Sequence, residues 1–310
     1  MLGTLALCGL GLLLCGKQVA EATASALELC LFVLLPSLFP FFVLSSLLIS
    51  SGVVQRLAPL LERPMQAVFG LSGSCAAPVL LGALGGYPIG ARSTADLYLS
   101  GQCSLCEAMH LLRFCNNAGP AFLIGVVGGG LLQDPRTGVL LWLIHLFSAF
   151  TLSLSSFNRK DSVKAKSITA NTNNSASLLS TFLQSVADAF SSFLNICAFV
   201  ILFAILTRLL TTTPLFIRIC SLLPGPFSFW NGLSTGILEL TAGSAVLASA
   251  RLPRRLLLPT LSFLCGWGGI SVQCQSISLL RKAGLPCRGY LLAKLLQGLL
   301  AAILTLVFCL

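Results

Sequence analysis

The residues best suited to bind a polar solute lie in two glycine-rich stretches that interrupt apolar sequence. The first, at 82–90, reads Gly-Ala-Leu-Gly-Gly-Tyr-Pro-Ile-Gly; the second, at 232–243, reads Gly-Leu-Ser-Thr-Gly-Ile-Leu-Glu-Leu-Thr-Ala-Gly. Glycine and proline disfavour helix interiors, so both stretches are predicted to break and to expose backbone N–H and C=O groups. Broken backbone at membrane depth is tolerated only where protein buries it or where it lines a watery cavity. Both stretches are therefore candidates for a solute site.

Side chains in and after the first stretch add charge and hydrogen-bonding groups. Arg92 stands four residues before Asp96, a spacing that allows an ion pair on one helix face. Asn116 and Asn117 begin an apolar run, where two amides are costly without partners. They can bind a solute's polar edge or hydrogen-bond neighbouring helices, and both interpretations stay open. The candidate residues of this half are Gly85, Gly86, Tyr87, Pro88, Arg92, Asn116 and Asn117.

The second stretch contains an acid inside apolar sequence. An ionisable residue within a membrane segment is a functional hypothesis by default. Glu239 can bind a proton, sodium or a cationic group, neutralise a helix end, or pair with Arg92. Asp188 is expected only at the mouth of the next apolar helix, and His145 is expected to be satisfied by a neighbour. The candidate residues of this half are Glu239, Thr241, Gln273 and Gln275.

Composition places these residues in a membrane protein. The 310 residues are 56% hydrophobic and 9% charged, with a mean hydropathy of +0.94, whereas soluble domains carry about 25% charged residues. Apolar runs long enough to cross about 30 Å of hydrocarbon recur. The runs are 29–49, 110–132, 138–156, 190–210, 258–280 and 290–310. We therefore expect an all-α polytopic membrane protein whose first partner is the lipid bilayer.

Several other classes are disfavoured. The 19 Lys and Arg are scattered among short loops, without the dense basic stripe of a nucleic-acid surface, so no nucleic-acid partner is expected. Cys103 and Cys106 form an isolated C-x-x-C, so no metal site is predicted. Ser234 lies in a G-x-S-x-G match, but no histidine follows it. We expect no enzyme and no cofactor, with H⁺ or Na⁺ coupling left open, and homo-oligomer formation is also left open.

A polar linker divides the chain into halves with comparable elements. Residues 158–179 are rich in Lys, Asn, Ser and Thr, and their positive charge predicts a cytoplasmic location. The expected divisions are an N-terminal membrane helix at 1–27, a first repeat at 28–157, the linker, and a second repeat at 180–310. Loop charges favour inverted repeats with about seven full crossings and two re-entrant segments. In that topology residues 17–28, 133–137 and 251–255 lie outside.

Four motifs carry a family resemblance. The segments at 82–92, 114–127, 232–243 and 265–275 resemble the sporulation integral membrane protein YlbJ family. That family belongs to the nucleoside-recognition Gate group and resembles the core of concentrative nucleoside transporters. The resemblance implies transport of dipicolinic acid across the outer forespore membrane of a spore-forming bacterium. A nucleoside-type transporter is the alternative, and a structural or signalling membrane protein is an alternative of another class.

Overall fold

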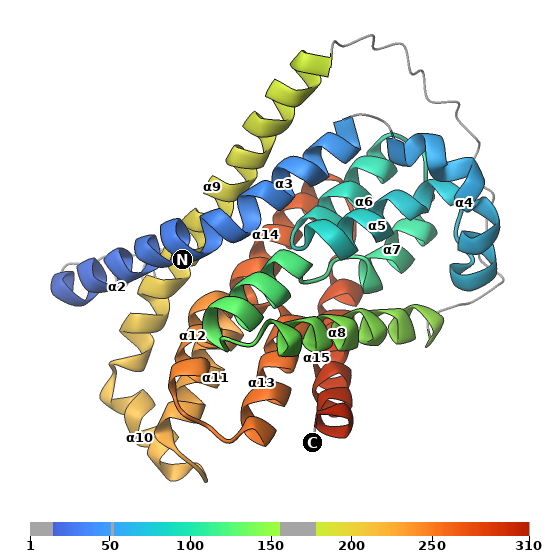
Figure 1. Ribbon diagram of the computed structural model, residues 1–310. Coiled ribbons are helices and arrows are strands. Elements are labelled where there is room, and N and C mark those ends of the chain that lie inside the picture. Colours follow the sequence, from blue (N-terminus) through green and yellow to red (C-terminus); the bar gives the residue numbers. More distant parts are fainter. Residues whose placement is uncertain (1–14, 51–52, 156–177, 310) are drawn as a thin grey trace.

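The computed structural model describes residues 15–50, 53–155 and 178–309, and these are helical with no strand among them (Figure 1). The membrane helix predicted near the N-terminus falls largely outside the described residues, as does most of the predicted linker. Every described backbone segment at membrane depth is therefore a helix, a break between helices or a short connection, as a bilayer requires.

The first half begins with two helices that are joined end to end and bent. A π-helical turn continues the first of them, and a helix rich in polar residues then leads to a pair of short apolar helices. A third short helix, a π-helical segment and a long helix complete this half. The elements are α2 (Gly16–Glu28), η1 (Leu29–Leu34), α3 (Leu35–Ser50), α4 (Val53–Phe69), η2 (Gly73–Cys75), α5 (Ala76–Gly85), α6 (Ile89–Leu99), α7 (Leu105–Phe114), η3 (Ala121–Leu131) and α8 (Pro135–Ser155).

The second half has a comparable order, with one long helix in place of the initial bent pair. One long helix comes first, a short helix follows, and two pairs of short helices precede a final long helix. The elements are α9 (Leu178–Thr211), α10 (Pro214–Leu222), α11 (Phe227–Leu238), α12 (Leu240–Ser249), α13 (Arg254–Trp267), α14 (Gly269–Lys282) and α15 (Arg288–Phe308). Figure 1 shows α9 crossing the α2–α3 segment, against which it packs. The two halves thus meet along α3 and α9.

Four described helices are long and apolar enough to cross a membrane, and the number rises to six if each of two bent pairs is one span. The four are Pro135–Leu154, Leu179–Thr211, Arg254–Lys282 and Arg288–Phe308. One bent pair joins Gly16–Leu34 to Leu38–Leu44 at 56°, and the other joins Ala58–Phe69 to Gly73–Gly85 at 87°. The all-α membrane architecture is confirmed, while the count of seven crossings and the inverted repeats stay predictions.

Two sequence-based expectations about local structure were wrong, while residues 17–28, expected to lie outside, form part of α2. Residues 110–132, expected as one helix, divide into α7, a non-helical stretch and η3. Asp188, expected at the start of a helix, lies well inside α9, which is 34 residues long. In each case the apolar content of a run does not show where the helical backbone hydrogen bonds begin and end.

Most glycines of the two motifs do not break helices, contrary to the sequence expectation. Gly82 and Gly90 lie within α5 and α6, and a β-carbon at either would come within 2.8 Å of the Cys115 carbonyl carbon. Gly236 and Gly243 bring α11 and α12 into contact in the same way. Small residues permit this close approach of helix backbones in membranes. The glycines therefore pack the hairpins, while the breaks fall beside them.

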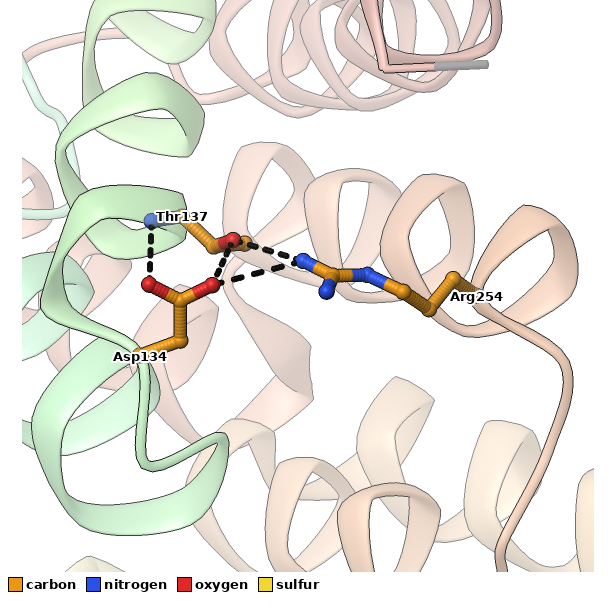
Figure 2. Close-up of polar contacts among 3 residues, drawn as sticks. All are labelled: Asp134, Thr137 and Arg254. Atoms are coloured by element: carbon orange, nitrogen blue, oxygen red, sulfur yellow. Dashed lines mark hydrogen bonds and ion pairs between the residues drawn. The ribbon is translucent and has the colours of Figure 1, made fainter.

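Polar residues link the two halves at one face of the helical body. Arg254, at the start of α13, lies 3.4 Å from the Asp134 carboxylate, and its guanidinium donates a 2.8 Å hydrogen bond to the Thr137 hydroxyl (Figure 2). The Thr137 hydroxyl in turn donates to Asp134 at 2.6 Å. The loop before α8 and the loop before α13 therefore lie on the same face, in agreement with their common predicted side.

Candidate solute site at four helix breaks

Four helix breaks meet near the centre of the protein. They lie between α5 and α6, between α7 and η3, between α11 and α12, and between α13 and α14. A β-carbon added at Gly86 would lie 3.2 Å from Gly119 Cα, one at Gly268 would lie 3.4 Å from the Tyr87 ring, and one at Gly269 would lie 2.9 Å from the Leu240 amide. The φ angles of Gly86, Gly268 and Gly269 are 80°, 85° and 76°, a region that L side chains rarely adopt. Glycine at these three positions thus permits the breaks and their close approach.

The breaks surround a central cavity of about 60 Å³. Its walls come from both halves and from the apolar faces of α3 and α9. Of the predicted site residues, Gly85, Gly86, Tyr87, Glu239, Thr241 and Gln275 line it, together with Ala118, Gly119, Ser271 and apolar residues that include Phe42. This volume holds a few water molecules but is well below the 300–1,000 Å³ typical of a ligand pocket. A ring-sized solute requires the cavity to widen.

Glu239 both ends the break in the second hairpin and lines the cavity. The backbone of Glu239 is extended, with φ −139° and ψ 115°, and the Glu239 carboxylate accepts a 2.6 Å hydrogen bond from the Ala242 amide at the start of α12. The helix N-terminus therefore stabilises the carboxylate. The proposed pairing with Arg92 was wrong, since Arg92 pairs with Asp96 instead. Neutralising a helix end, another of the sequence-based alternatives, is what the geometry shows.

Two other polar side chains at the cavity lack protein partners. Ser271 and Gln275 are 1% and 3% exposed, and neither the Ser271 hydroxyl oxygen nor Gln275 Oε1 has a hydrogen-bond partner. Buried polar groups are nearly always hydrogen-bonded, so these two await water or a ligand. Gln273 Oε1 also lacks a partner, but Gln273 does not line the cavity, and its amide nitrogen donates to the Trp267 carbonyl.

The two asparagines are hydrogen-bonded within the protein and do not line the cavity. Asn116 accepts from the Ala91 amide at 3.1 Å and donates to Ser276 at 3.0 Å and to Tyr290 at 2.9 Å. Asn117 donates to the Phe114 carbonyl at 2.7 Å. Of the two interpretations left open by the sequence, the structure matches the one in which these amides join helices.

A buried polar cluster beside the asparagines was missed from the sequence. Lys294 and Gln297 on α15 are both 0% exposed, and they bond each other at 2.5 Å. Gln297 also donates to Asn117 Oδ1 at 2.9 Å, while His145 Nε2 accepts from the Ala118 amide at 3.1 Å. The expectation that a neighbour satisfies His145 is thus met at this nitrogen. Lys294 stands alone in the apolar run 290–310, and the rule used for Glu239 would have found it.

A second cavity, of about 310 Å³, lies beside α6 and α9. Arg92 and Asp96 line it, with 3.9 Å between Nε and Oδ2, and Asp188 faces it from α9. Both side chains of the Arg92–Asp96 pair are half exposed or more, so the pair contributes little stability. Phe42 lines both cavities. Arg92 is therefore separate from the central site. Pro88, which follows a cis peptide bond and precedes α6, also lies outside the lining of that site.

The remaining motifs have structural explanations. No group of three or more His, Cys, Asp or Glu with metal-binding geometry occurs among the described residues. Cys103 is buried and Cys106 exposed, so the two thiols point to different environments. Ser234 lies in the middle of α11, whereas a nucleophile elbow requires a strand-to-helix turn. The candidate site among the described residues therefore remains the cavity between the broken helices.

The fold and the cavity define an all-α polytopic membrane protein with paired broken helices, and comparison with known proteins shows its family. The chain belongs to the Gate family, described as nucleoside recognition, which matches residues 31–223. Within that group it is similar to the sporulation integral membrane protein YlbJ of Bacillus subtilis (strain 168), with 30% identity over 91% of this chain and 76% of that protein. No solved structure matches. The resemblance seen in the four sequence motifs is confirmed.

Proposed function

We propose that this protein is a transporter or facilitator for a small polar solute, and that the solute is dipicolinic acid crossing the outer forespore membrane during sporulation. The observation that carries the proposal is the central cavity, where backbone of four helix breaks meets the unpartnered Ser271 hydroxyl and Gln275 carbonyl oxygen. Membership of a sporulation membrane protein family supports the biological setting.

The repeated order of elements supports transport. Each half contains a long helix, a broken hairpin, a second broken segment and a last long helix. Discontinuous helices at corresponding positions of two halves are typical of secondary transporters, in which the halves are inverted and the solute binds between them. In our proposal the halves are inverted repeats, and the four breaks form the binding site near the bilayer midplane.

The two cavities suggest a route. The larger one has the volume of a ligand pocket, and in our proposal it receives the solute on the linker side. Phe42, which lines both cavities, then separates it from the central site. The Glu239 carboxylate opposes a dianion there, so we propose that a bound H⁺ or Na⁺ offsets its charge during transport.

Nucleosides are the second candidate solute. Gln275 Oε1 is an unpartnered acceptor, and a nucleoside offers N–H and O–H donors that a dipicolinate dianion lacks. The family description also refers to nucleoside recognition. A structural or signalling role, the alternative of another class, predicts no solute movement by this chain alone.

The test is uptake by the purified chain in liposomes. We expect accumulation of radiolabelled dipicolinate, reduced at least about tenfold by Ser271→Ala or Gln275→Leu because each removes a hydrogen-bonding group from the cavity. The matched control is Gln66→Leu, on the exposed face of α4. Competition by unlabelled uridine distinguishes between dipicolinate and nucleosides as the solute.

The outcomes are distinct. Uptake blocked by excess dipicolinate but not by uridine supports the first solute, and the reverse supports nucleosides. Uptake of neither solute by correctly folded wild-type protein contradicts both transport proposals. Full activity of both cavity variants would mean that the solute passes elsewhere.

A further inference from the structure

Lys294 is the one lysine or arginine that is buried among the described residues. It lies on α15 with 0% exposure, in an otherwise apolar segment. Its ammonium donates to the Asn116 carbonyl and, at 2.5 Å, to Gln297 Oε1. It also lies 5.8 Å from the centre of the Tyr87 ring. These contacts hold the side chain inside the protein, so it does not extend toward the membrane surface.

None of these contacts supplies a negative charge. The ion pairs within the described segments are Arg92–Asp96, Arg208–Glu21 and Arg254–Asp134, and none includes Lys294. A buried charge is costly unless it is paired. An ammonium has three donors, and two of them are used by neutral oxygens. The third has no hydrogen-bond partner among the described residues, and the Tyr87 ring lies 5.8 Å from the nitrogen, so an anion on that side would complete the site.

Tyr87 stands between Lys294 and the central cavity. Its ring lies beside the ammonium and also lines the cavity, and its hydroxyl donates to the Cys265 carbonyl at 3.0 Å. It belongs to the break between α5 and α6. Because the cavity of about 60 Å³ must widen to admit a ring-sized solute, displacement of this one ring would both enlarge the cavity and uncover the ammonium.

We propose that Lys294 is the anion-recognising residue of the solute site, and that it binds a carboxylate of the solute once the Tyr87 ring has moved aside. This inference rests on the proposed function and names the charge that an anionic solute needs. Gln297 positions the ammonium, since it accepts from Lys294 and donates to Asn117 at 2.9 Å. Charge-assisted hydrogen bonds of this kind are about twice as strong as neutral ones.

The first test measures binding to purified protein by calorimetry with dipicolinate and with its neutral diamide, pyridine-2,6-dicarboxamide. We expect Lys294→Gln and Lys294→Met to weaken dipicolinate binding by about 10- to 100-fold while changing diamide affinity less than about twofold. Lys282→Gln is the matched control, because Lys282 is exposed at the end of α14. Equal loss for both ligands indicates a structural role and overturns the inference.

The second test starts from wild-type protein, so its protection measurement does not depend on folding of a variant. An amine-reactive acetylating reagent is applied with and without dipicolinate, and labelling of Lys294 and Lys282 is measured by mass spectrometry. We expect dipicolinate to protect Lys294 alone, and Tyr87→Ala to increase its labelling. Labelling that dipicolinate does not reduce, or no labelling of Lys294 even in Tyr87→Ala, overturns the inference.

The failure of this inference differs from failure of the proposed function. Wild-type protein that neither binds nor transports dipicolinate contradicts the proposed solute. If the Lys294 variants bind dipicolinate as tightly as the wild-type protein does, the proposed function stands and only the proposed role of Lys294 is wrong.

Discussion

The two halves of this protein break their helices at corresponding places but use the polar groups beside those breaks differently. In the first half, the amides of Asn116 and Asn117 are bonded to other helices. In the second half, Ser271 and Gln275 face the central cavity without partners, and Glu239 adds a carboxylate. The two halves therefore have a comparable order of elements, but the unpartnered polar groups that face the central cavity come from the second half.

The largest effect is expected at Glu239. Glu239→Ala removes both the carboxylate in the cavity and the cap of α12, so dipicolinate uptake in liposomes should fall to background. The free energy of unfolding should fall by about 0.5–2 kcal/mol from the lost cap. Glu239→Gln keeps an oxygen that can accept from the Ala242 amide, so we expect it to restore stability but not uptake. Wild-type uptake by the alanine variant would contradict the assignment of the site to the second half.

An intermediate effect should separate Asn117 from Gln275. Asn117→Ala leaves the buried Gln297 amide without one acceptor, so we expect the free energy of unfolding to fall by about 1–3 kcal/mol while the KM for uptake rises much less than in Gln275→Leu. Gln275→Leu removes a group without a partner, so the KM should rise about tenfold with little loss of stability. Denaturant unfolding and uptake kinetics measure both quantities. A higher KM in Asn117→Ala together with lower stability in Gln275→Leu would mean that the first half contacts the solute and the second half holds the structure together.

The smallest effect is expected at the contact that joins the halves at one face. The Thr137 hydroxyl and amide, followed by Arg254, hold the pKa of Asp134 below its ordinary value of 3.8. A lowered carboxyl pKa stabilises the folded protein above pH 3.8, and that contribution is lost as pH falls through the folded pKa. Arg254→Ala should therefore cause a barely measurable decrease in melting temperature, constant between about pH 5 and 8. A large decrease, or one that varies over that pH range, would mean that the contact is more important than its exposure indicates.

The sequence was sufficient for the membrane class and the positions of the broken hairpins, because hydropathy and glycine density act locally, and the resemblance of four motifs was sufficient for the family. It could not show which polar residues face the cavity. Asn116 and Gln275 are both buried amides, and only the helices packed around them decide that one is satisfied and the other is not. The glycine motifs were misread for a similar reason, since Gly82 and Gly90 contact a carbonyl from a distant segment. Lys294 was visible as a charge in an apolar run and was overlooked.

The length of α9 has a consequence for the membrane surface. At about 1.5 Å per residue, the 20 positions from Asp188 to Arg208 cover about 30 Å, the thickness of the hydrocarbon core. The helix nevertheless begins at Leu178, ten positions before Asp188. Its first turns would then project about 15 Å beyond the hydrocarbon as a rigid rod. The second half would consequently begin above the lipid headgroups, on a helix whose middle residues Ile196 and Val200 line the central cavity.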